Sequence, residues 1–172
     1  MARHPALTPG VGWASCPANK TVTKLKHIDL EGYACFVTTN VYQRERIFSN
    51  PKIADLVLSA IFFLKDKEYY RLYSFVIVPE HLHLIILPQN EKTLSQIMHS
   101  LKSYTAKKIN HLLGRSGKIW QDGFYERIIR NEDDLREKAI YIENNPVRER
   151  LVEEPEKYFY SSARYREKMD YF

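Results

Sequence analysis

The fold is decided by residues 70–88, "YRLYSFVIVPEHLHLIILP". Runs rich in β-branched and aromatic residues lie on both sides of the short Pro79-Glu80 link, which predicts two antiparallel strands. Side chains of a strand alternate between its two faces, so His81 and His83 share one face while leucines occupy the other. Two neighbouring imidazoles on an apolar strand indicate a candidate metal site.

The rest of the chain adds two strands and three helices. Strands are expected where β-branched and aromatic residues gather, at residues 33–42 and 124–131. Helices are expected at residues 50–67, 93–113 and 132–145. The first two helices have apolar residues at helical spacing, and the third has acids in its first turn and ends before a proline.

The resulting order, β-α-β-β-α-β-α, predicts an α+β fold. Its first six elements match the ferredoxin-like split βαβ arrangement, a four-stranded antiparallel sheet with helices on one face. Asn50 and Thr93 are the expected N-caps of the first two helices, and Gly114 is the expected stop of the second. The additional C-terminal helix follows the fourth strand closely, so it can lie near the histidines.

Length and composition fit a single cytoplasmic domain. The chain has 172 residues and a net charge of +5, which suits an anionic partner such as nucleic acid without establishing one. Its two cysteines form no CxxC pair, and no apolar run approaches the roughly 20 residues that span a membrane. We expect a flexible N-terminal extension at residues 1–28, a domain at 29–165 and a C-terminal tail at 166–172. That tail is either disordered or folded over the active site.

A tyrosine and an amide are available near the histidine pair. Tyr141 and Asn145 are four residues apart, so they are neighbours on one face of a helix. If that face meets the histidine strand, Asn145 can add an oxygen ligand, and Tyr141 can reach a group bound to the metal. Tyrosine is a poor nucleophile because its unperturbed pKa is about 10, but a metal polarises the electrophile. Tyrosine, metal and a phosphodiester together give a covalent phosphotyrosine, from which a strand is rejoined without ATP.

Each of these residues also has a purely structural interpretation. Histidines on a core strand are more often structural than ligands, and in a chain with twelve tyrosines a single one on a helix is most often a packing residue. Asparagine before proline is ordinary turn chemistry at the end of a helix. The residues alone therefore leave a metal-phosphoester site open.

Five segments resemble one protein family, in the same order along the chain. They are "FVTTNVYQRERIF", "VPEHLHLII", "IWQDGFYERIIRN", "YIENNPVRERLV" and "YFYSSARY". Together they resemble the HUH-type single-tyrosine transposases, and most closely the REP-associated tyrosine transposases of bacteria. The resemblance covers roughly residues 32–165 and implies the same ferredoxin-like fold.

The resemblance implies roles for four residues. His81 and His83 would be metal ligands, Asn145 would complete the metal shell, and Tyr141 would be the nucleophile that forms a 5′-phosphotyrosine. Tyr125 is the main rival nucleophile, ranked lower because it would lie on the sheet without an amide partner one turn away. The implied metal is Mg²⁺ or Mn²⁺, and the implied substrate is single-stranded DNA with short hairpins, without a nucleotide cofactor.

Basic and aromatic residues are candidates for DNA contacts, about half of them expected to be solvated surface instead. They are Lys102, Lys107, Lys108, Arg115, Lys118, Trp120, Arg127 and Arg130. Two departures from the family pattern stand out. Phe36 replaces a histidine common among relatives, and Arg148-Glu149-Arg150 replaces a glycine-containing turn, which makes the local backbone uncertain but not the site.

Several functions remain open at this stage. The first is an active strand transferase, and the second is a domesticated hairpin-binding protein that no longer cuts DNA. A histidine-pair phosphoesterase generally needs a second histidine motif, which is absent, and a replication initiator or relaxase is usually longer. The chain is either a monomer, if Tyr141 acts on its own histidines, or a homodimer.

Overall fold

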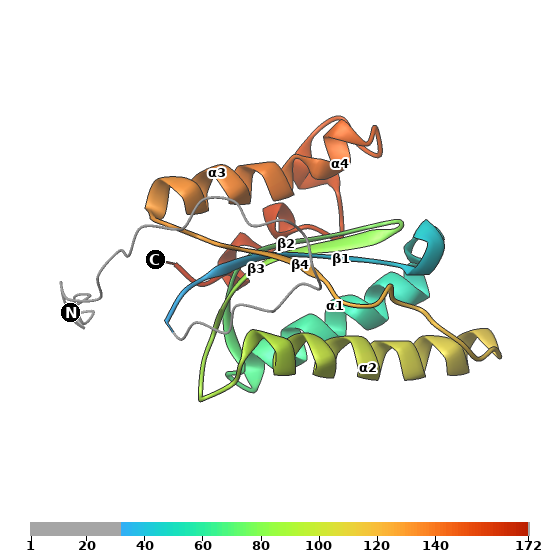
Figure 1. Ribbon diagram of the computed structural model, residues 1–172. Coiled ribbons are helices and arrows are strands. Elements are labelled where there is room, and N and C mark those ends of the chain that lie inside the picture. The colour runs from blue at the N-terminus through green and yellow to red at the C-terminus, as the bar shows by residue number, and fades with distance from the viewer. Residues whose placement is uncertain (1–31, 172) are drawn as a thin grey trace, which may run out of the picture.

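The computed structural model describes residues 32–171 (Figure 1). The N-terminal extension expected at residues 1–28 lies outside the described residues. Among those described, no helix combines the length and the hydrophobicity needed to cross a membrane.

A four-stranded antiparallel sheet forms the centre of the fold. Its strands are β1 (Cys35–Asn40), β2 (Tyr70–Val78), β3 (His81–Pro88) and β4 (Tyr125–Ile128). They lie in the order β2-β3-β1-β4, which is the predicted ferredoxin-like topology. The hairpin of β2 and β3 forms as expected, with Val78 opposite His81. The last strand is shorter than its predicted range of 124–131.

Helices cover both faces of this sheet (Figure 1). The helices α1 (Pro51–Asp66) and α2 (Leu94–Leu113) pack on one face, and α3 (Glu132–Glu143) and α4 (Asn145–Arg148) lie over the other. The caps were predicted correctly: Asn50 accepts from the Lys52 amide, Thr93 forms a capping box, and Gly114 ends α2 in the left-handed conformation.

Alternation along β3 separates two hydrophobic cores. Leu82, Leu84 and Ile86 belong to the large core beneath α1 and α2. His81, His83 and Ile85 share the opposite face, where Ile85 joins a smaller core with residues of β1, β2 and α3. Burying each such leucine or isoleucine contributes about 2 kcal/mol, so the register that fixes the core also directs both histidines towards α3 and α4.

The helix expected to end before Pro146 continues after a short break. The helical path passes through Asn144, and the Glu149 amide donates to the Asn145 carbonyl at 3.0 Å. Pro146 lies in the first turn of α4, where its missing N–H removes no hydrogen bond. The chain therefore carries one more turn across the sheet than predicted.

Segments after α4 fix the last helices to the sheet. The hydroxyl of Ser162 donates to Glu143 of α3 at 3.1 Å and lies 2.9 Å from the Ser74 hydroxyl on β2. Further on, the Asp170 carboxylate accepts from the Leu72 amide at 2.7 Å. Leu72 lies at the far end of β2 from the histidines. The C-terminal tail thus packs on the sheet beyond the boundary predicted at 165, and away from the site.

Candidate active site

His81 and His83 form the centre of the site, with a direct contact between their rings. Their Nε2 atoms are 3.0 Å apart, and the residues are 7% and 5% exposed. The Thr38 hydroxyl on β1 lies 2.7 Å from Nδ1 of His83. With the proton on Nδ1, His83 donates to Thr38 and leaves the Nε2 lone pair free for a metal.

Burial favours the neutral form of both imidazoles. Burial lowers the pKa of His81. Burial, and then the neighbouring His81, lower the pKa of His83 to about 3. Neutral imidazole is the form that binds metals, so burial favours the state of these side chains that a cation requires.

Tyr141 lies beside the histidines with its ring partly in solvent. It is 38% exposed, and its ring centroid lies 5.8 Å from that of His83 and 6.1 Å from that of Phe36. The Arg148 guanidinium lies 4.9 Å from the centroid of the same ring. The phenol is therefore held on one side by the sheet and on the other by a cation, and it still reaches solvent.

A cavity of about 330 Å³ opens between β1, β4 and α3 next to this tyrosine. Its lining residues come from both the sheet and the helix: Phe36, Thr38, His83, Tyr125, Arg127, Lys138 and Tyr141. Tyr125 is opposite Thr38 in the sheet, and Thr38 is opposite His83, so the two tyrosines share one cavity. The location of Tyr125 on the sheet was predicted correctly, but it does not separate this rival from the site. Phe36 contacts both tyrosine rings and His83.

Asn145 is buried one turn beyond Tyr141. It is 6% exposed, and its Oδ1 has no hydrogen-bond partner among the described residues. A buried acceptor without a donor costs about 1–3 kcal/mol, and a bound cation would remove that cost. Imidazole nitrogens and an amide oxygen are donor types that suit a divalent cation.

Glu149 is a site residue that the sequence analysis missed. Its Oε1 lies 3.8 Å from Nε2 of His81, and one ligand atom each of Glu80, His81 and Glu149 lie within 4.8 Å of one another. Burial and the nearby Glu80 raise the pKa of Glu149. The departure at residues 148–150 therefore places a carboxylate beside His81. Glu149 is eight residues after Tyr141, which is about two helical turns. This spacing could have predicted that both side chains lie on the same face of a continuous helix.

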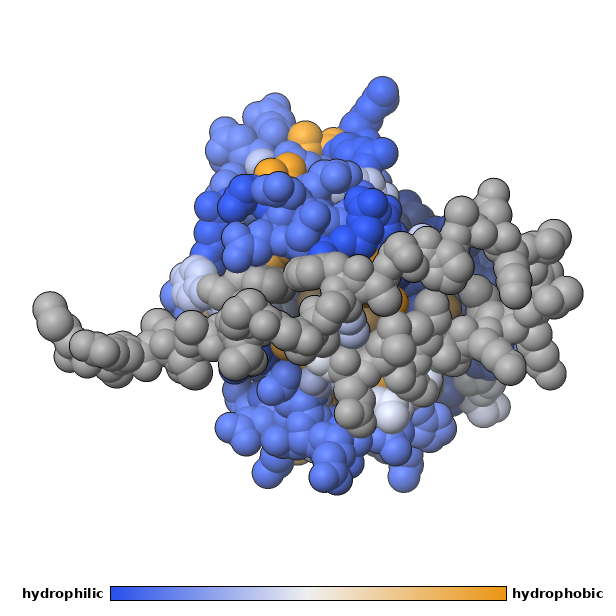
Figure 2. Space-filling view, turned by 60° about the vertical axis from the view of Figure 1, so that its left-hand side comes forward, coloured by the Kyte–Doolittle hydropathy of each residue, from blue (hydrophilic) through white to orange (hydrophobic). Residues whose placement is uncertain are grey.

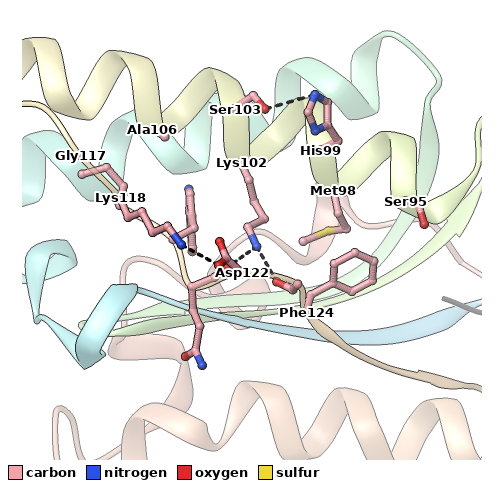
Figure 3. Close-up of a pocket in the computed structure, with 14 residues that line it drawn as sticks. Ser95, Met98, His99, Lys102, Ser103, Ala106, Gly117, Lys118, Asp122 and Phe124 are labelled. Carbon is pink, nitrogen blue, oxygen red and sulfur yellow. Dashed lines mark hydrogen bonds and ion pairs between the residues drawn. The ribbon is translucent and has the colours of Figure 1, made fainter. Parts of the chain in front are cut away.

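Two of the expected DNA contacts are occupied inside the protein. Trp120 is 5% exposed, donates to the Thr105 hydroxyl at 2.9 Å and packs against Phe48, so no base can stack on it as expected. Lys102 donates to the carbonyls of Gln121 and Gly123 at 2.7 and 2.5 Å, in a pocket between α2 and the segment before β4 (Figure 3). Burial lowers the pKa of Lys102. These hydrogen bonds join α2 to that segment.

Most of the other expected contacts are exposed side chains in ion pairs. The pairs are Arg115 with Glu45, Lys118 with Asp122, and both Arg127 and Arg130 with Asp134. Lys107 and Lys108 are exposed on α2. The helix α2 covers the face of the sheet opposite α3, so its lysines lie away from the tyrosine cavity (Figure 1). Among the expected contacts, Arg127 lines that cavity. In Figure 2, the visible surface of the described residues is mostly hydrophilic, with small hydrophobic spots.

A ferredoxin-like sheet whose histidine pair faces a helix-borne tyrosine defines the class of single-tyrosine transposases. Residues 32–145 match the family described as "Transposase IS200 like", and the chain belongs to that family. It is 29% identical to the REP-associated tyrosine transposase of Escherichia coli K12 over 126 residues, 73% of each chain. It also resembles a solved structure of a REP-associated tyrosine transposase bound to a REP hairpin. The TM-score is 0.70 at 26% identity, with 84% of each chain covered. The predicted family is thereby confirmed.

Proposed function

We propose that this transposase is a metal-dependent single-stranded DNA endonuclease and strand transferase in which Tyr141 is the nucleophile. The observation that carries the proposal is the position of the Tyr141 ring, 5.8 Å from the His83 ring at the edge of an open cavity. A phenol that is partly exposed and beside a cation site can meet a phosphodiester entering from solvent.

The covalent step conserves one phosphoester bond. The Tyr141 oxygen attacks phosphorus and loses its proton, a new P–O bond forms, and the bond to the 3′ oxygen breaks. The leaving oxygen takes up a proton and becomes a free 3′-hydroxyl, while the 5′ side stays on the enzyme as phosphotyrosine. Attack by another 3′-hydroxyl reverses the step, so rejoining needs no ATP.

His81, His83 and Asn145 are the proposed ligands of Mg²⁺ or Mn²⁺. When bound, such a cation would offset negative charge that develops on the phosphoryl oxygens. Thr38 orients the His83 ring, and Arg148 holds the Tyr141 ring. The serine and glutamate contacts at the end of α3 fix the helix that bears the nucleophile.

Hairpin-forming DNA is the proposed substrate. The support is the similarity, at 26% identity and 84% coverage, to a transposase solved with a REP hairpin. Arg127 and Lys138 line the tyrosine cavity and are suited to bind backbone phosphates there. Because Tyr141 and the histidines of one chain lie together, we infer that a monomer suffices for cleavage.

The test uses hairpin oligonucleotides with single-stranded flanks, incubated with the protein and Mn²⁺ and run on a denaturing protein gel. A 3′-end label should migrate with the protein, whereas a 5′-end label should be released, because the 5′-phosphate is the group retained. Tyr141→Phe should abolish the adduct, and Tyr125→Phe should still form it. If Tyr125→Phe loses the adduct instead, the nucleophile is misassigned.

A hairpin-binding protein without cleavage is the alternative. Tight binding in a gel-shift assay with no adduct under any metal condition would support that alternative and contradict the proposed chemistry. The full set of Tyr141, both histidines and a buried amide favours the enzyme, because a retired enzyme need not keep all four.

A further inference from the structure

We propose that the Glu149 carboxylate is an additional ligand of the cation held by His81 and His83, and that it allows the protein to bind this cation before DNA arrives. The proposal deepens the proposed function and rests on it.

The first argument is the convergence of donor atoms. Oε1 of Glu149 lies 3.8 Å from Nε2 of His81, the nitrogen that lies 3.0 Å from Nε2 of His83. Adjacent ligands of one octahedral ion lie about 3 Å apart. The imidazole pair meets this spacing, and the carboxylate needs to move by less than about 1 Å to join it.

The second argument is the environment of the carboxylate. The Glu149 side chain is 25% exposed. Among the described residues the carboxylate makes no hydrogen bond and no ion pair with a lysine or arginine, and the His81 ring lies 3.8 Å from it. Glu80 adds a second carboxylate on the other side of that ring, 3.9 Å from Nδ1. A partly buried carboxylate that faces an imidazole and lies near a second acid is stabilised when a divalent cation joins these groups.

The third argument is the helical path that brings the oxygens together. Asn145 and Glu149 are one turn apart, joined by the 3.0 Å bond from the Glu149 amide to the Asn145 carbonyl. Both therefore lie on the same side of the last helical turn as Tyr141. The amide Oδ1 of Asn145 is buried without a donor. The site then offers two imidazoles, one amide oxygen and one carboxylate.

The carboxylate changes what the site can hold on its own. Two neutral imidazoles and an amide carry no charge, and oxygen-preferring cations such as Mg²⁺ and Mn²⁺ then depend on substrate phosphates for tight binding. Affinity for such cations rises with the number of charged ligands. A site that includes Glu149 therefore binds Mn²⁺ in the absence of DNA, and this property distinguishes it from a site without the carboxylate.

The experiment titrates full-length protein with Mn²⁺ alone, without DNA, by isothermal titration calorimetry. Wild type should bind one Mn²⁺ per chain, and Glu149→Gln, which keeps the side-chain shape, should lower the affinity about tenfold or more. Glu149→Asp, which keeps the charge, should recover part of that loss. The matched control is Glu153→Gln, an exposed acid four residues further along the chain, which should bind like wild type.

Two results would overturn the proposal. One is Glu149→Gln binding Mn²⁺ within about twofold of wild type while the His81→Ala/His83→Ala variant loses binding. The other is wild type that does not bind Mn²⁺ until DNA is added. Neither result bears on the proposed chemistry, which is tested by a separate experiment. That experiment measures the 3′-label adduct with Glu149→Gln at saturating Mn²⁺. Loss of the adduct in wild type itself would overturn the proposed function instead.

Discussion

The Arg148 guanidinium lies 4.9 Å from the centroid of the Tyr141 ring, so the residue that follows the Asn-Pro-Val segment covers the nucleophile. A cation over an exposed aromatic ring contributes about 0.5–1 kcal/mol. Arg148→Met should therefore slow adduct formation by about twofold to fivefold through a less ordered tyrosine, with Mn²⁺ affinity unchanged.

A matched control for this change is Arg164→Met. Its guanidinium lies 5.3 Å from the ring centroid of Phe159, a similar contact outside the site. Single-turnover adduct rates of both variants separate the two positions. An Arg164→Met rate as low as that of Arg148→Met would indicate a general loss of stability and contradict the positioning role.

Thr38→Val should weaken Mn²⁺ binding about tenfold, because the hydroxyl that fixes the His83 ring is lost. The isosteric control is Thr39→Val. Thr39 is the next residue on β1, points to the opposite face and has a buried hydroxyl without a partner among the described residues. That variant should keep full Mn²⁺ affinity and lose no stability, since no hydrogen bond is broken. Equal Mn²⁺ affinities for wild type and Thr38→Val would refute the orienting role.

The sequence predicted the elements and their order because alternation, helical spacing and capping are local signals. It also located the histidine pair, since two histidines in a strand share a face wherever the strand lies. Glu149 was missed because its approach to His81 depends on the helix continuing past Pro146. The residue before a proline disfavours the helical conformation, so the helix was expected to end there. Trp120 was misjudged because the burial of its ring depends on Thr105 and Phe48, which are distant in sequence.

Asp134 anchors the start of α3, and its removal should destabilise the fold. Burial alone would raise the pKa of this carboxyl, but hydrogen bonds from the side chain and backbone of Arg130, together with the charge of Arg127, hold it below its ordinary value. Asp134→Asn should lower the free energy of unfolding by about 1–2 kcal/mol at neutral pH.

The pH dependence of this loss has a definite sign. A carboxyl whose pKa is lower in the folded state contributes stability in full above its unfolded pKa, and loses it as the pH falls through the folded pKa. The gap between wild type and Asp134→Asn should therefore be constant above about pH 5 and shrink below about pH 4. Urea unfolding across this range measures it, with exposed Asp133→Asn as the control. A gap that widens in acid would contradict this assignment.

Arg150 adopts φ of 57° directly after the Glu149 position, a conformation that favours glycine. A side chain in the left-handed region costs about 1–2 kcal/mol. Arg150→Gly should therefore raise the free energy of unfolding by about 1 kcal/mol. Arg136→Gly, in the interior of α3, should lower it by about 1 kcal/mol. Thermal unfolding of both variants measures the two changes in the free energy of unfolding. Changes of the same sign would contradict the backbone argument.

Lys138 should contribute more to DNA binding than the lysines of α2. Its side chain lines the tyrosine cavity one turn before Tyr141, whereas Lys107 lies on the helix that covers the opposite face of the sheet (Figure 1). Each lost phosphate contact lowers the salt dependence of binding to single strands by about 0.7 in a plot of log affinity against log salt. Lys138→Gln should show that change and weaker hairpin binding at every salt concentration, and Lys107→Gln should show neither. If Lys107→Gln weakens binding as much, the DNA must pass around the sheet edge to reach α2, and the cavity is not the main phosphate contact.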